Sequence, residues 1–444
     1  MDLLGNPEQE EPFLRRGLCI GDVQSGKTSS YIGLINKAAD AGYADAMKDL
    51  GDLYYDGKYG AKDDEPDYNT ARQWYEKAAE NGYSGAYTSL GNMYKNGKGV
   101  EKDDEKALDN YMKGVARGNS GAMNQVGICY HDGIGVEKDY VQAMEWYLKA
   151  SNAGSSSAMY NLGKMYMNGE GIDQPDYEEA KNWYMCAAEE DDAAAMNKLG
   201  NLYFYAHLSA EPDYENAQKW YQKAANEGNK DAFYSLGKMY YYAYGVEQDY
   251  VKARENYEKA GESNANALNM LGVIYDEGRG VPVDYVKAKE YYEKAEKQGS
   301  DQALDNLGSL YYDGHGVEQS YAKARTYYEQ AVEKGSSYGD TLKNLGMIYY
   351  KGYDVTADYT KAKNYFLKAE EAGVDDAEMW GALGSIFYEE KDHATSAKYF
   401  VKQAEKNQSA VSMRNAGVEF SNAGDYENAL IWYGKAIDNG YEKS

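Results

Sequence analysis

The sequence predicts an all-α fold: an array of about eleven helical hairpins placed one after another along the chain. Three observations indicate this fold. A Leu-Gly or similar pair recurs every 33 to 40 residues, apolar residues around it follow helical spacing, and an acidic residue recurs at one position between the pairs. Such self-similarity at a fixed period is typical of repeat architectures, whose core grows in one dimension. The usual estimate of domain number from length therefore does not apply to these 444 residues.

The repeat is clearest between Gly299 and Gly335. Apolar residues in each half of this stretch recur at i, i+3, i+4 and i+7, the pattern of one helix face. They are Ala303, Leu307, Leu310 and Tyr311 in the first half, and Tyr321, Ala324, Tyr328 and Ala331 in the second. Between the halves lies Asp313-Gly314-His315-Gly316, whose glycines suit a turn with positive φ. A lone hairpin of this size cannot bury its apolar faces, so each must pack against neighbouring hairpins.

The glycine of the Leu-Gly pair lies inside the first helix of each repeat, where it costs about 1 kcal/mol relative to alanine. We therefore expect the second helix to cross too close for a Cβ atom, with the aromatic residue three positions on filling the space beside it. These glycines are Gly51, Gly91, Gly127, Gly163, Gly200, Gly237, Gly272, Gly308, Gly346, Gly384 and Gly417.

Each second helix begins after a residue of the type that caps helices. We expect its side-chain oxygen to accept a hydrogen bond from an otherwise unpaired N–H group, which stabilises the helix by roughly 1 kcal/mol. The capping residues are Asp67, Asp103, Asp139, Asp176, Asp213, Asp249, Asp284, Ser320, Asp358, Asp392 and Asp425. This structural role accounts for many of the carboxylates that could otherwise suggest a catalytic or metal site.

Taken together, Leu-Gly-x-x-Tyr, Gly-x-Gly-Val and Asp-Tyr-x-x-Ala-x-x-Trp-Tyr-x-Lys-Ala resemble the SEL-one-like repeat (SLR), a relative of the tetratricopeptide repeat. The resemblance covers residues 43–444. It implies a right-handed α-solenoid that acts as an adaptor or scaffold for other proteins.

Residues 1–42 form a separate N-terminal segment. Gly21, Gly26, Lys27 and Thr28 fit a phosphate-binding loop, and the longer string resembles the opening of a helicase-like Z-one domain. Such a loop works in a parallel sheet that supplies an acidic metal ligand, and no later segment reads as such a strand. Lys37-Ala38-Ala39 instead matches the second helix of a repeat, so we expect this helix to cap the array. Nucleotide binding through Gly21–Thr28 is the alternative function.

Bulk properties restrict the partners. The net charge of −26 disfavours DNA, RNA and anionic membranes and favours basic or neutral partners. No apolar run reaches the length of a membrane span. Three widely spaced cysteines suggest neither a disulfide framework nor a metal pair, so we expect a reducing, cytoplasmic location.

No catalytic, metal or cofactor site is predicted. The four histidines fall in different repeats, mostly at turns, and we expect them to be solvated. The acidic clusters lack the spaced ligands and central glycine of a calcium loop.

Binding is the predicted function: a non-catalytic scaffold that holds a protein or peptide. By analogy with tetratricopeptide arrays, first helices line a concave groove at positions three before, one after and four after the glycine. Residue types vary in the first two of these rows, as on a recognition surface, although ordinary solvated helix positions would vary as well. The predicted peptide-binding residues are Asn124, Tyr160, Asn197, Asn201, Tyr234, Lys238, Tyr241 and Asn269.

Overall fold

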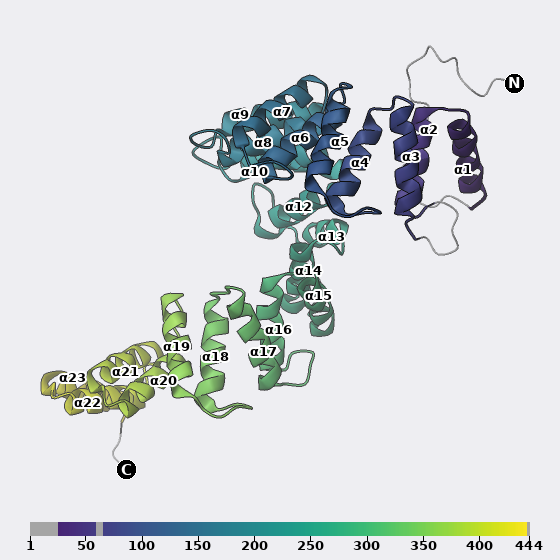
Figure 1. Cartoon of the computed structure of the whole chain (residues 1–444). Helices are drawn as coiled ribbons and strands as arrows, with labels where there is room; N and C mark the ends of the chain where they lie inside the picture. Colours follow the sequence, from purple (N-terminus) through teal and green to yellow (C-terminus); the bar gives the residue numbers. More distant parts are fainter. Residues whose placement is uncertain (1–24, 59–64, 442–444) are drawn as a thin grey trace. The chain divides into compact units, whose positions relative to one another are not determined.

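The computed structural model describes residues 25–58 and 65–441, and the described residues form 23 α-helices and no strand. The chain divides into two compact units, Met1–Trp220 and Tyr221–Ser444, with the division inside α11. Each unit is a row of helical hairpins (Figure 1), so the predicted all-α repeat fold is confirmed. The predicted boundary between residues 42 and 43 stays a prediction.

The first unit holds α1 and the hairpins α2–α3 to α8–α9, followed by α10 and the start of α11. Their bounds are α1 Ser25–Asp40, α2 Ala44–Tyr55, α3 Tyr68–Glu80, α4 Gly85–Asn96, α5 Asp104–Val115, α6 Ser120–Asp132, α7 Tyr140–Asn152, α8 Ser156–Asn168, α9 Tyr177–Glu189, α10 Ala193–Phe204 and α11 Tyr214–Asn226.

The second unit continues the pattern from the end of α11. Its helices are α12 Lys230–Tyr242, α13 Tyr250–Ala260, α14 Ala265–Glu277, α15 Tyr285–Lys297, α16 Asp301–Asp313, α17 Tyr321–Glu333, α18 Gly339–Lys351, α19 Tyr359–Glu371, α20 Ala377–Glu389, α21 His393–Asn407, α22 Ala410–Asn422 and α23 Tyr426–Asp438. Even-numbered helices are the first helices of the repeats, and odd-numbered helices from α3 onward are the second.

Side-chain capping begins every second helix, as predicted. Asp249 Oδ1 accepts from the N–H of Lys252 at 2.9 Å, and Ser320, the single serine at this position, accepts from Lys323. The same bond is present at the other predicted capping residues: Asp67, Asp103, Asp139, Asp176, Asp213, Asp284, Asp358, Asp392 and Asp425.

The helix glycines are sites of close approach between the two helices of a hairpin. A Cβ atom on Gly237 would lie 2.6 Å from the ring of Tyr257, and one on Gly163 would lie 2.6 Å from the ring of Tyr184. The ring that fills this space belongs to the second helix, which differs from the expectation. Each second helix carries two consecutive residues, usually both aromatic, such as Tyr291-Tyr292. The aromatic residue three after the glycine stacks on the first of the two, as Tyr275 does on Tyr291 at 5.6 Å between ring centroids.

The turn between α16 and α17 also follows the prediction. Gly314 ends α16 with φ 74°, and Gly316 follows with φ 66°. A Cβ atom on Gly316 would lie 2.6 Å from Cβ of Tyr285 in the preceding hairpin. Glycine is needed here because the turn combines a left-handed backbone with contact between repeats.

The N-terminal helix α1 packs against α2, where a second helix would stand in a preceding repeat. Ile35 and Ala39 are buried in a core shared with Met47 and Leu50. Leu34, the neighbour of Ile35 in the sequence, is exposed. Within the described part of the chain, no helix combines the length and apolar character needed to cross a membrane.

Candidate binding surface on the first helices

First helices of adjacent repeats contact one another: α4 meets α6 in the first unit, and α18 meets both α16 and α20 in the second. The surface that α16, α18 and α20 share contains a hollow of about 430 Å³, here called the α16–α20 hollow. Its lining residues all come from first helices or their capping positions. They are Ser309, Tyr312, Asp313, Asp340, Lys343, Asn344, Met347, Asp376 and Glu378.

A buried tyrosine of the second helix supports the floor of the α16–α20 hollow. Asn344 Nδ2 donates to Tyr328 Oη at 3.0 Å, and Ser309 Oγ lies 3.1 Å from the same oxygen. Burial raises the pKa of Tyr328 to about 12, so its hydroxyl is protonated at neutral pH. The floor is therefore polar and neutral, and it is held in place by bonds from two successive first helices.

The lining of the α16–α20 hollow is acidic. Asp340 pairs with Lys343 at 3.2 Å, and Glu378 pairs with Lys351 at 3.1 Å. Asp376 accepts from the N–H of Met379 as the cap of α20. With Asp313, four carboxylates thus face two lysines, and this excess of negative charge suits a cationic side chain.

A second hollow of about 210 Å³, the α6–α8 hollow, lies on the first helices of the first unit. It is lined by Ile128, His131, Asp132, Tyr147, Asn161, Lys164 and Met165. His131 Nε2 lies 3.0 Å from Glu170, which follows α8, so the imidazole joins two repeats. Its side chain is 15% exposed, so His131 is not the solvated loop residue that was expected.

The other histidines also contact the protein. His393 Nδ1 lies 2.9 Å from the carboxylate of the buried Glu419 in the next repeat. His315 stacks on Tyr285 at 4.4 Å, and the ring of His207 lies 4.5 Å from that of Tyr177. His315 is exposed, as expected, whereas His131, His207 and His393 are half-buried. The expectation of solvated histidines is therefore wrong for these three, because their partners belong to adjacent repeats and are distant in sequence.

Three predicted peptide-binding residues are buried: Asn124, Asn197 and Asn269 are 6%, 7% and 3% exposed. Asn161 donates to Asn124 Oδ1 at 2.9 Å, and Asn306 donates to Asn269 Oδ1 at 3.0 Å. Both bonds join successive first helices. A contact of these residues with a partner stays a prediction, but the bonds seen here stabilise the array.

The remaining predicted residues are distributed over both units. Tyr160, Asn201, Tyr234 and Lys238 are half-buried on first helices. The ring of Tyr160 lies 5.7 Å from that of the buried Tyr184. The first unit contains Asn124, Tyr160, Asn197 and Asn201, and the second contains Tyr234, Lys238, Tyr241 and Asn269.

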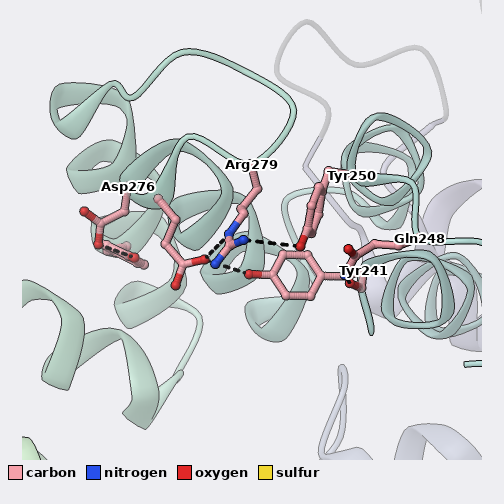
Figure 2. Close-up of polar contacts among 7 residues, drawn as sticks. Tyr241, Gln248, Tyr250, Asp276 and Arg279 are labelled. Atoms are coloured by element: carbon pink, nitrogen blue, oxygen red, sulfur yellow. Dashed lines mark hydrogen bonds and ion pairs between the residues drawn. The ribbon is translucent and has the colours of Figure 1, made fainter. Parts of the chain in front are cut away.

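Tyr241 is 9% exposed and links α12 to the following repeat (Figure 2). Its hydroxyl donates to Glu277 at 3.0 Å, and Arg279 Nε donates to the same carboxylate oxygen at 2.9 Å. Arg279 Nη1 also donates to Tyr250 Oη at 3.4 Å. The carbonyl of Tyr241 accepts from Gln248 Nε2 at 2.9 Å, which ties the loop after α12 back to the helix.

In several repeats, the tyrosine that ends the Trp-Tyr, Tyr-Tyr or equivalent pair of a second helix makes a hydroxyl bond that was not predicted from the sequence. Tyr75 Oη donates to Asp52 at 2.8 Å, and Tyr111 Oη donates to Asn92 at 2.7 Å. Each acceptor directly follows a helix glycine, in one of the rows expected to face the groove. The signal was present in the sequence, because these positions hold tyrosine far more often than phenylalanine.

The structure describes only part of the predicted phosphate-binding loop. Gly21 lies outside the described residues, and Gly26, Lys27 and Thr28 belong to the first turn of α1, whose side chains are described from Tyr31 onward. The part of the chain that the structure describes contains no strand to hold such a loop. The resemblance to a helicase-like domain finds no support in the comparisons below.

Comparison with known proteins points to one repeat family. The family model described as Sel1 repeat matches ten segments: 44–83, 84–119, 120–155, 156–192, 193–229, 231–264, 265–300, 301–336, 341–374 and 412–441. The hairpin α20–α21 lies between the last two, so the structure contains one repeat more than the family model matches.

Two solved structures support the same assignment. A protective antigen of uropathogenic Escherichia coli with an SLR fold is 27% identical, with a TM-score of 0.54 over 92% of this chain and 94% of that one. A Sel1 repeat protein from Oxalobacter formigenes is 34% identical, with a TM-score of 0.51 over 56% of this chain and 99% of that one. The comparison with curated proteins gives no match.

Proposed function

Because this chain belongs to the Sel1 repeat family, whose proteins are generally interaction scaffolds, we propose that it is a non-catalytic scaffold that holds a partner protein on its first helices. The partner contributes an extended segment, and the first helices of consecutive repeats contact consecutive parts of it. Neither nucleic acid nor a membrane is a partner in this proposal. The proposed location is cytoplasmic.

The observation that carries the proposal is the α16–α20 hollow. It is about 430 Å³ in volume, comparable to a site for a few side chains, and three successive repeats line it. Polar groups on its floor are fixed by Tyr328, so they do not have to be ordered when a ligand binds. Binding pockets in proteins combine such preformed shape with a few placed polar groups.

Charge selects the class of segment. The carboxylates that line the hollow and the net charge of −26 favour a lysine or arginine side chain over an acidic one. Tyr312 adds an aromatic wall against which the alkyl stem of such a side chain can pack. The proposed ligand is therefore a basic or neutral segment, with a cationic side chain in the α16–α20 hollow.

The test uses two synthetic peptides of equal length, one alternating glycine with lysine and one alternating glycine with glutamate. Isothermal titration should detect binding of the lysine peptide alone, and the affinity should fall as salt is raised. The double variant Asp313→Asn/Asp340→Asn should weaken binding about tenfold, which is about 1.4 kcal/mol.

A matched control removes the same charge elsewhere. Glu290 and Glu318 are exposed carboxylates of the second unit that do not line the hollow, and Glu290→Gln/Glu318→Gln should leave the affinity unchanged. Equal losses in both double variants would mean that net charge, not the hollow, attracts the peptide. Binding of the glutamate peptide with the same affinity would contradict the proposed charge selection.

A further inference from the structure

The α6–α8 hollow of the first unit and the α16–α20 hollow of the second occupy the same place in their repeats. Each lies between the first helices of successive repeats. Counted from the helix glycines, their lining residues correspond: Ile128 to Ser309, His131 to Tyr312, Asp132 to Asp313, Asn161 to Asn344 and Lys164 to Met347. The repeat therefore forms a hollow at one fixed position, and the residues at that position set its chemistry.

The α6–α8 hollow offers a donor and an acceptor that are not paired with each other. Lys164 lines the hollow, is exposed, and forms no ion pair with a carboxylate in the described part of the chain. Asp132 also lines it and is exposed. His131 Nδ1 lies 2.5 Å from Oδ1 of Asp132, which leaves Oδ2 able to accept a hydrogen bond from a ligand.

Tyr147 supplies a second donor to the α6–α8 hollow, because it is 2% exposed and lines the hollow. The equivalent hydroxyl of Tyr328 is bonded to the two residues that correspond to Ile128 and Asn161. Ile128 has no polar side-chain atom, and Asn161 Nδ2 donates to Asn124 Oδ1 at 2.9 Å instead. Burial raises the pKa of Tyr147 above its ordinary value, so its hydroxyl is a donor at neutral pH.

Size and charge select the ligand. The volume of about 210 Å³ is below the roughly 300–1,000 Å³ of sites for drug-sized molecules, and it suits one side chain. Asp132 and Glu170, which lies 3.0 Å from His131 Nε2, repel a carboxylate, whereas Lys164 repels an ammonium group. A primary amide is neutral and carries both a carbonyl acceptor and an NH₂ donor.

We propose that the α6–α8 hollow binds the carboxamide side chain of an asparagine or glutamine in the partner's segment. Its carbonyl oxygen accepts from Lys164 and Tyr147, and its NH₂ group donates to Asp132. Ile128 and Met165 contact the methylene groups of the side chain. This inference rests on the proposed scaffold function and deepens it, because the first unit then selects a neutral polar side chain and the second selects a cationic one.

The test uses a synthetic peptide that alternates glycine with glutamine, beside the lysine peptide described above. Methyl groups of methionine labelled with carbon-13 report on each hollow in NMR spectra of the full chain, because Met165 lines the α6–α8 hollow and Met347 lines the α16–α20 hollow. The glutamine peptide should shift the Met165 signal and leave that of Met347 in place, and the lysine peptide should do the reverse. A Met165 signal that does not respond to the glutamine peptide overturns the proposal.

Two variants test the assigned donors. Lys164→Met should weaken binding of the glutamine peptide about tenfold, and Tyr147→Phe should weaken it about fivefold. The matched control is Lys102→Met, since Lys102 is an exposed lysine of the same unit that does not line the hollow, and it should leave the affinity unchanged. Urea midpoints close to that of the wild type show that the variants fold. An affinity that neither hollow variant lowers would place the amide elsewhere and overturn the proposal.

The two methionine signals separate this inference from the scaffold proposal. A lysine peptide that shifts Met347, together with a glutamine peptide that leaves Met165 unchanged, overturns the amide site and leaves the scaffold function standing. A peptide that alternates glycine with glutamate and shifts Met165 as strongly as the glutamine peptide overturns the selectivity for an amide. If no peptide shifts either signal, the scaffold proposal fails, and this inference fails with it.

Discussion

Gly308 of α16 lies directly against the ring of Tyr328 of α17, and a Cβ atom on the glycine would lie 2.5 Å from two ring carbons. Tyr328 is fully buried and bonded through its hydroxyl to Ser309 and Asn344. The ring therefore cannot move aside without breaking the floor of the α16–α20 hollow. Gly308 thus determines both how closely the two helices of the hairpin approach and the geometry of the candidate site.

Gly308→Ala should destabilise the second unit by about 2 kcal/mol, because overpacking outweighs the gain in helix propensity. Urea unfolding followed by circular dichroism at 222 nm measures the change. Gly434 of α23 is the matched control, since a Cβ there would meet nothing within 4 Å. Gly434→Ala should stabilise by about 0.5–1 kcal/mol, and equal effects of the two substitutions would refute the packing argument.

Asn269→Ala should lower the free energy of unfolding by about 1–3 kcal/mol, because Asn306 loses its buried acceptor. Asn266 lies on the same helix and is exposed, so Asn266→Ala should change stability by less than about 0.5 kcal/mol. A loss of stability in Asn269→Ala alone would show that the buried asparagines stabilise contacts between repeats. A neutral Asn269→Ala that weakens peptide binding would instead favour the role predicted from the sequence.

Asp305 lies three residues before the helix glycine, as Asn269 and Asn124 do in other repeats, and it is 7% exposed. Burial raises its pKa, although hydrogen bonds from Thr341 and Ser336 act against the shift. The folded state therefore holds this proton to higher pH than the unfolded state, so stability falls as pH rises through the folded pKa.

Asp305→Asn should remove this dependence. The variant should be more stable than the wild type at neutral pH, and the difference should shrink as pH falls toward the ordinary range of a carboxyl group. Urea midpoints measured from pH 4 to pH 8 follow the trend. A difference that is constant with pH would mean that the charge of Asp305 does not affect folding.

The hydroxyl of Tyr241 and the carboxylate of Glu277 should be energetically coupled across the repeat boundary. In a double-mutant cycle with Tyr241→Phe and Glu277→Ala, we expect a coupling of about 1 kcal/mol in the free energy of unfolding. Tyr242→Phe is the control, because Tyr242 adjoins Tyr241 and is 48% exposed. Its cycle with Glu277→Ala should be additive.

Much of the local structure could be predicted because it depends on neighbours in sequence. Each capping residue binds an N–H group two or three positions on, so Asp249 and Ser320 could be assigned from spacing alone. The crowded helix glycines could also be predicted, since repeated glycine in a helix needs a packing reason. The identity of the crowding ring, that of Tyr328 against Gly308, required the crossing geometry of two helices.

The candidate site was harder to predict, because its contacts join positions 16 to 39 residues apart. The asparagines predicted for peptide contact hold first helices together instead, as Asn306 does with Asn269. His131 and Glu170 meet across a repeat boundary that no local pattern marks. A helical pattern tells which residues share a face, but not how much of that face the next helix covers.

The sequence by itself determined the all-α class, the hairpin period, the capping of the second helices and the absence of room at the helix glycines. These follow from chain stereochemistry and from hydrogen bonds within a few residues. The tertiary structure alone decided which polar side chains remain open to a partner. Exposure depends on how closely successive hairpins pack, and it leaves the α16–α20 hollow open while it buries Asn269 and the hydroxyl of Tyr257.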